Sequence, residues 1–183
     1  MIGSLFSVVK AGLNSFTKDE SGSATLDFAI ALPAYMLIFS STYESGMHST
    51  RQVMLQHGLD QTAREVRIGR IPSPDHDILT EKICEYSSII PDCLNQIRLE
   101  MVVRDPRAWT PPVGEVQCVD RESDGDPVLN FTNGANNQLM VLRACALFDP
   151  MIPGSGLGYQ LPKKSGGAYA IVASSAYVME PFQ

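Results

Sequence analysis

The feature that most constrains this chain is an apolar run near its N-terminus. Residues 28–39 read FAIALPAYMLIF, twelve consecutive apolar residues, and the twenty residues 24–43 carry one charge, Asp27. Twenty helical residues at about 1.5 Å each cover the roughly 30 Å hydrocarbon core of a bilayer. A run of twelve also matches the core of a cleavable signal peptide. The run alone therefore predicts either a membrane anchor or a signal.

Three features of the flanking sequence favour the anchor. Residues 1–22 form a long upstream segment that contains Asp19 and Glu20, whereas a signal peptide usually starts with a short basic region. No clean A-x-A cleavage site follows the run, and residues 40–44 (SSTYE) are only a weak substitute. Residues 42–70 lack proline and have apolar residues at helical spacing, which predicts one helix that starts in the bilayer and continues beyond it. The residues at this spacing are Leu55, Leu59, Ala63 and Val66.

Asp27 needs an explanation, because a carboxylate inside a membrane helix costs about 2.5–3.5 kcal/mol on insertion scales. In one interpretation it lies near the helix start, where the interface is wet and a negative charge suits the helix dipole. In the other it has a function set by its place five residues after Gly22 and just before Phe28. Its position alone allows both interpretations.

Residues 19–33, DESGSATLDFAIALP, resemble the N-terminal motif of the TadE-like pseudopilins of tight-adherence (Tad/Flp) pilus systems. The resemblance implies that a prepilin peptidase cuts between Gly22 and Ser23, so that Asp27 becomes residue five of the mature chain. The family usually has Glu there, followed by an aromatic residue, and Asp27 is a departure with a shorter arm. The acid would neutralise the new amine at Ser23, since a pair of charges is tolerated in hydrocarbon better than each one alone.

The same resemblance extends through the rest of the helix. Phe28 and Pro33 belong to the assembly helix that it implies, with a kink expected at Pro33 because proline lacks the amide that would pair with the Ala29 carbonyl. Residues 63–70 resemble the alanine-arginine end of the stalk helix. A solvated basic face is the more favoured interpretation of three arginines on one side there, ahead of a dedicated binding site. These residues are Arg64, Arg67 and Arg70.

Beyond the stalk the sequence predicts an α+β, pilin-like globule. Prolines at 72 and 74 predict that the long helix ends before them. A short helix is then expected over residues 75–87, and its apolar face consists of Ile78, Leu79, Ile83 and Tyr86. Alternating residues predict about four strands of a small antiparallel sheet packed on the stalk helix. The expected strands cover residues 97–103, 115–119, 138–148 and 169–179. The expected segments are a leader at 1–22, a membrane part at 23–43, a periplasmic helix at 44–71 and a periplasmic domain at 72–183.

Four cysteines lie downstream of the apolar run: Cys84, Cys93, Cys118 and Cys145. An even number on one side of a membrane segment fits disulfides in an oxidising compartment, while free buried thiols remain an alternative. Close C-x-x-C pairs are absent, which argues against zinc. Pairing of Cys84 with Cys93 and of Cys118 with Cys145 is preferred among the three possible connectivities.

The sequence offers little sign of catalysis or of a cofactor. A net charge of −6 argues against a nucleic-acid partner. Residues 120–126 (DRESDGD) resemble the start of a calcium loop, but Phe131 stands where the bidentate Glu belongs, so a solvated acidic turn is favoured. The glycines of residues 154–158 lack the end of a phosphate loop and predict a flexible loop. No metal site is expected, because the three histidines, His48, His57 and His76, show no ligand spacing.

The favoured interpretation is therefore a non-enzymatic minor pilin that takes part in Tad/Flp pilus assembly and adhesion. The resemblance implies as partners the prepilin peptidase, other pilin or pseudopilin subunits, and the assembly platform in the bacterial inner membrane. The C-terminal domain would be periplasmic, and the processed subunit could reach the extracellular pilus. An unprocessed anchor carrying a periplasmic binding module is the alternative, and a secreted enzyme released near residue 42 is a more remote one.

Overall fold

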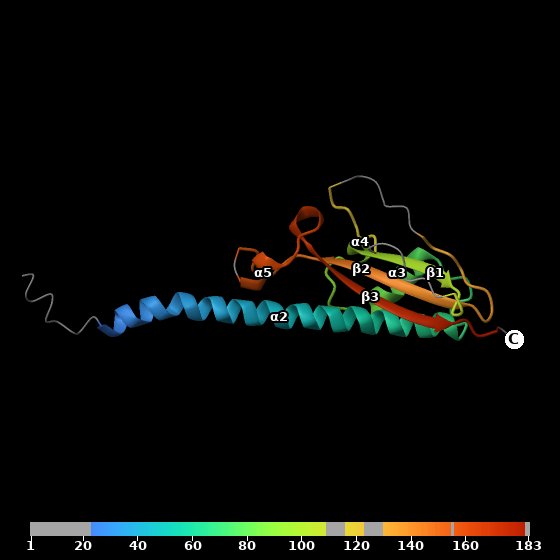
Figure 1. Ribbon diagram of the computed structural model, residues 1–183, viewed down its shortest axis with the longest axis horizontal. Helices are drawn as coiled ribbons and strands as arrows, with labels where there is room; N and C mark the ends of the chain where they lie inside the picture. The colour runs from blue at the N-terminus through green and yellow to red at the C-terminus, as the bar shows by residue number, and fades with distance from the viewer. Residues whose placement is uncertain (1–22, 109–115, 123–129, 155, 182–183) are drawn as a thin grey trace, which may run out of the picture. The chain divides into compact units, whose positions relative to one another are not determined.

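The structure is a computed structural model that describes residues 23–108, 116–122, 130–154 and 156–181 (Figure 1). In chain order the elements are α2 (Ser23–Arg67), α3 (His76–Tyr86), α4 (Cys93–Gln96), β1 (Ile97–Arg104), β2 (Leu139–Phe148), α5 (Gly156–Gln160), the 3-10 helix η1 (Ser165–Gly167) and β3 (Tyr169–Val178). The chain divides into an N-terminal unit that ends at Ser40 and a compact C-terminal unit that begins at Ser41. The C-terminal unit therefore includes residues 41–67 of α2 as well as the sheet.

The described residues form an α+β fold with one antiparallel sheet of three strands in the order β1-β2-β3. In register, Ile97 of β1 lies opposite Ala146 of β2, and Leu139 of β2 lies opposite Val178 of β3. The expectation of about four strands was wrong. Residues 116–119 have no strand structure, and Glu115 lies outside the described residues.

The edge of β1 is instead occupied by a short piece of chain next to Phe131. The Met101 amide donates to the Asn130 carbonyl at 3.0 Å, and the Thr132 amide donates to the Met101 carbonyl at 2.9 Å. This is a single parallel bridge between Met101 and Phe131, too short to count as a strand. It satisfies backbone groups that an edge strand would otherwise leave unpaired.

Helix α2 supplies one side of the core, as its apolar periodicity predicts. All four residues of the predicted stripe are buried: Leu55, Leu59, Ala63 and Val66. They pack in one cluster with residues of the sheet, including Leu142 and Ala144 of the central strand and Ile171 of β3. Figure 1 shows the C-terminal part of α2 running alongside the sheet. Burial of each large aliphatic side chain in this cluster contributes about 1.5–3 kcal/mol.

Helix α2 ends at Arg67, four residues before the predicted boundary at residue 71. Gly69 adopts a positive φ of 74°. Its amide donates to the Val66 carbonyl at 3.0 Å, and the Arg70 amide donates to the Glu65 carbonyl at 2.9 Å. These two bonds form a Schellman cap, which needs a left-handed residue just past the helix end. The glycine, and not the later prolines, therefore terminates α2.

The second helix, α3, follows closely where the sequence placed it. Asp75 is its N-cap, and the side chain accepts from the Ile78 amide at 2.8 Å. Leu79 and Ile83 are fully buried, as predicted, but Ile78 is exposed and Thr80 is buried in its place. Part of the segment predicted as a flexible loop, residues 154–158, is helical, because α5 begins at Gly156; residue 155 lies outside the described residues.

Two glycines of α2 give a matched test of how closely its C-terminal half packs. A Cβ on Gly58 would lie 1.9 Å from the Ser87 hydroxyl oxygen and 2.9 Å from the Ile83 carbonyl oxygen, whereas a Cβ on Gly46 would meet nothing within 4 Å. We expect Gly58→Ala to lower the free energy of unfolding by about 1–3 kcal/mol through overpacking. Gly46→Ala should raise it by up to about 1 kcal/mol through helix propensity.

The measurement is chemical denaturation of the two full-length variants, followed by circular dichroism in the same detergent as the wild type. Equal shifts of the same sign in both variants would contradict the close approach of α2 and α3 at Gly58.

Candidate functional site at the start of helix α2

The first part of α2 exposes a continuous apolar surface. The exposed fractions of its large apolar side chains run from 36% at Leu32 to 75% at Ile30. The other members are Leu26, Phe28, Tyr35, Met36, Leu37, Ile38 and Phe39. Isolated exposed apolar residues are ordinary, but a surface of this extent indicates a site that another apolar phase or protein covers.

Length and composition allow this helix to span a membrane. It contains an 18-residue window with a mean hydropathy of 1.5, and 0% of that window is buried. The core helix of a soluble protein would be mostly buried, so the exposure separates this first part of α2 from that class. An N-terminal signal sequence has the same composition.

Asp27 and Phe28 lie in the first turns of α2, and both are exposed. Ser23, the first residue of α2, precedes Asp27 by four positions, so the backbone at Ser23 and the side chain at Asp27 lie on the same side of the helix, one turn apart. Gly22 lies outside the described residues. The helix continues through Pro33, so this proline does not end it.

The face of α2 that carries the buried residues Leu55, Leu59, Ala63 and Val66 becomes polar toward the N-terminal end of the helix. Continuing the stripe backward from Leu55 reaches Arg51, His48 and Glu44 at steps of four, three and four residues. Glu44 is 1% exposed and Arg51 is 5% exposed. Buried charges need partners, because removing them from water is costly.

The partners of Glu44 are backbone amides of the segment that follows β2. Its carboxylate accepts from the Met151 amide at 2.9 Å and from the Ile152 amide at 3.3 Å. Arg51 binds the same segment, since its Nη1 donates to the Asp149 carbonyl at 3.1 Å. Glu44 and Arg51 thus hold the chain after β2 against α2.

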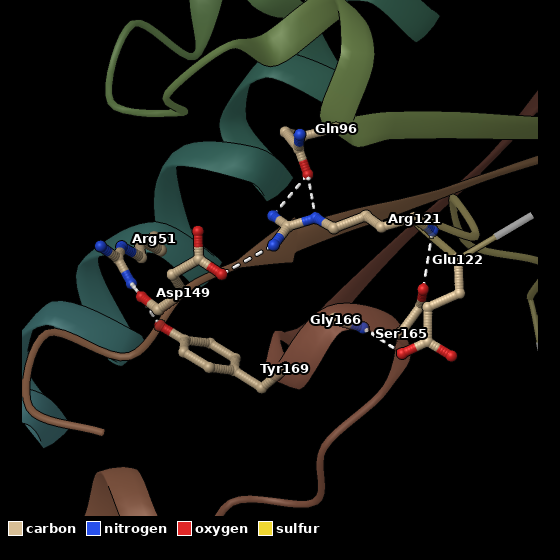
Figure 2. Close-up of polar contacts among 8 residues, drawn as sticks. All are labelled: Arg51, Gln96, Arg121, Glu122, Asp149, Ser165, Gly166 and Tyr169. Carbon is tan, nitrogen blue, oxygen red and sulfur yellow. Dashed lines mark hydrogen bonds and ion pairs between the residues drawn. The ribbon is translucent and has the colours of Figure 1, made fainter. Parts of the chain in front are cut away.

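Arg51 also contacts two aromatic side chains, of which Figure 2 shows Tyr169. Its Nη1 donates to the Tyr169 hydroxyl, and its guanidinium lies 4.9 Å from the centre of the Phe148 ring. Cation–π attraction of this kind offsets part of the cost of burying the charge. Burial raises the pKa of the Tyr169 phenol, while the Arg51 guanidinium acts in the opposite direction. These contacts account for how the Arg51 charge is accommodated in a buried position.

A second polar network fastens residues 116–122 to the rest of the C-terminal unit (Figure 2). The Arg121 guanidinium donates to Gln96 Oε1 at 2.6 and 2.9 Å and forms an ion pair with Asp149 at 2.7 Å. The Arg121 amide donates to the Ser165 hydroxyl, and the Gly166 amide donates to the Glu122 carboxylate. These contacts join segments that are far apart in sequence.

Both disulfides have the pairing that the sequence favoured. Cys84 of α3 is bonded to Cys93 of α4, and Cys118 is bonded to Cys145 of β2. The second bridge attaches residues 116–122 to the central strand, and the first ties α3 to α4. Each would add about 2–4 kcal/mol to a small domain in an oxidising compartment.

The three arginines near the end of α2 do not share one face, because the helix ends before Arg70. Arg67 pairs with Glu180 at 2.8 Å, and Arg70 pairs with Glu65 at 3.1 Å. Arg64 is exposed and lines an open groove of about 490 Å³ between α2 and β3, together with Asp60, Ala63, Arg67, Ile68, Ser175, Ala176 and Tyr177. Burial raises the pKa of the Tyr177 phenol to about 12, so this residue is neutral at physiological pH.

The remaining sequence candidates are dispersed. Asp120 accepts from the Ser165 hydroxyl at 2.7 Å, and residues 123–126 of the acidic turn lie outside the described residues. His48 lies beside the Tyr169 ring, while His76 Nδ1 is 3.0 Å from Asp77. Within the part of the chain that the structure describes, no three potential metal-ligating side chains come together.

Comparisons of the chain with protein-family models, with curated proteins and with solved structures find no match.

Proposed function

We propose that this chain is a minor pilin of the TadE-like type, cut by a prepilin peptidase between Gly22 and Ser23 and active in the assembly of a Tad/Flp pilus. The observation that carries the proposal is the uncovered apolar surface of residues 24–39, which begins directly after the cleavage site. In a filament subunit such a surface has two roles. The apolar surface contacts lipid before assembly, and it packs against the helices of other subunits in the filament.

The position of Asp27 supports the proposed chemistry of the mature N-terminus. Cleavage leaves an ammonium at Ser23, at the positive end of the helix dipole, where a cation is unfavourable. Asp27 lies one helical turn away and brings the compensating charge. The pair can form within one chain, or the carboxylate can receive the amine of an adjacent subunit as the filament grows.

The fold of the C-terminal unit supports an anchor that is retained. Residues 41–44 lie inside α2, and the Glu44 carboxylate is held by the amides of Met151 and Ile152. Release near residue 42 would cut the helix next to this buried contact. Residues 41–67 are also part of the core of the C-terminal unit, so the anchor and the globule share one helix. The role is structural, and no catalytic residue is assigned.

Deletion of the gene in its host tests the assembly role. We expect surface filaments counted by electron microscopy to be lost or greatly reduced, and to return when the wild-type chain is supplied from a plasmid. An unchanged number of filaments in the deletion strain would contradict the proposal and favour the alternative of an anchored periplasmic binding module.

A further inference from the structure

We propose that residues 149–154 and 156–160, named the collar here, rest in the headgroup layer of the membrane, so that their partner is a lipid surface. The inference depends on the proposed function in one respect, the anchoring of residues 24–39 in a bilayer. Three side chains would make the contact, and all are exposed: Met151 (48%), Ile152 (37%) and Tyr159 (74%).

The collar lies at the residue where the apolar surface stops. A Cβ on Gly156 would be 2.3 Å from the Ser41 hydroxyl oxygen and 3.4 Å from the Ser41 Cα, so α5 touches α2 at Ser41. Ser41 follows Phe39, the last apolar residue of the run, by two positions, and consecutive Cα atoms are about 3.8 Å apart. The headgroup layer on each side of the hydrocarbon is about 5–7 Å thick. The chain connection alone therefore keeps this contact at headgroup depth.

Hydrogen bonds and close contacts tie the collar to α2 and to itself. The Met151 and Ile152 amides donate to Glu44, and Arg51 Nη2 donates to the Met151 sulfur at 3.5 Å. Gly158 of α5 approaches so closely that a Cβ there would be 2.5 Å from the Ile152 carbonyl oxygen. These contacts use the backbone and the buried side of the collar. The Met151 side chain remains 48% exposed although its sulfur contacts Arg51, and the Ile152 side chain remains 37% exposed.

The chemistry of the collar fits an interface between lipid and water. Tyrosine is enriched at headgroup level, where its ring is buried and its hydroxyl stays wet. Glu44 is the first charged residue after Asp27, and an exposed carboxylate at headgroup level would be repelled by anionic lipids. The collar amides bind that carboxylate and leave it 1% exposed. Lys163 donates to the Gly158 carbonyl and adds a positive charge beside the lipid phosphates.

Tryptophan fluorescence with brominated lipids tests the collar directly. The one natural tryptophan, Trp109, is first changed to Phe, and a single reporter is then introduced as Tyr159→Trp. The full chain is reconstituted in vesicles of phosphatidylethanolamine and phosphatidylglycerol, with or without bromine on the acyl chains. We expect a blue-shifted emission and a clear loss of fluorescence in the brominated vesicles.

Two matched reporters serve as controls. Phe39→Trp lies within the apolar run and should be strongly quenched. Val53→Trp, at a side chain that is 65% exposed, lies twelve residues beyond Ser41, about 18 Å along the helix, and should not be quenched.

The outcomes separate the collar from the anchor. Quenching of Phe39→Trp with Tyr159→Trp as bright as Val53→Trp would overturn the collar and leave the anchor standing. Absence of quenching in both would overturn the anchor and the collar with it. If Tyr159→Trp is blue-shifted and protected from aqueous acrylamide but not quenched by bromine, a protein surface such as a second copy covers it, and the lipid assignment is wrong.

Discussion

Replacing Gly22 with leucine should stop the proteolytic processing of this chain. The proposed cut breaks the peptide bond between Gly22 and Ser23, and a residue without a side chain lets a membrane protease approach the backbone closely. Leucine would fill that space. The wild-type chain recovered from host membranes should have lost residues 1–22, whereas the variant should keep them, as measured by intact mass spectrometry.

A matched control separates the cleavage site from a general effect on the leader. Gly12→Leu makes the same change in side-chain size within residues 1–22, and it should be processed like the wild type. Cleavage of Gly22→Leu at the wild-type position and with wild-type efficiency would contradict the proposed site. Loss of cleavage in both variants would point to targeting rather than to recognition of Gly22.

Changing Asp27 to asparagine should leave processing intact and remove the subunit from filaments. The side chain of asparagine carries no charge, so it cannot neutralise the ammonium that cleavage creates at Ser23. An uncompensated charge in hydrocarbon costs about 2.5–3.5 kcal/mol, which corresponds to a decrease on the order of 100-fold in the assembled population. The measurement is the amount of the processed subunit in sheared filaments relative to the membrane fraction.

The charge at Asp27 can be distinguished from its size by two further variants. Asp27→Glu keeps the charge and should assemble at least as well as the wild type. Asp60→Asn, an exposed change in the C-terminal unit, should have no effect on filament content. Equal incorporation of Asp27→Asn and the wild type would mean that Asp27 is tolerated by the wet interface and has no pairing role.

Local patterns in the sequence predicted most of the fold. The spacing of Leu55, Leu59, Ala63 and Val66 identified the buried face of α2, and alternation identified all three strands of the sheet. Strand formation at residues 116–119 was a wrong prediction, because alternation does not show what pairs with it. A disulfide from Cys118 to Cys145 holds that segment on the central strand instead.

The buried polar face of α2 was missed for a related reason. Glu44 and Arg51 continue the helical spacing of the buried residues that starts at Leu55, and this spacing was the only sign in the sequence that they face inward. Their partners, however, are separated from them by about 100 residues and depend on the path of the chain after β2. A periodicity shows which side of a helix faces inward, but it does not show which carbonyls and amides will be there. The collar follows from those contacts and could be found only in the structure.

The most direct test of processing after Gly22 is to sequence the N-terminus of the mature wild-type protein, purified from sheared filaments and from membranes of its host. Cleavage between Gly22 and Ser23 predicts a chain that begins at Ser23 in both fractions. A mature chain that begins at Met1, or one released near residue 42, would contradict it.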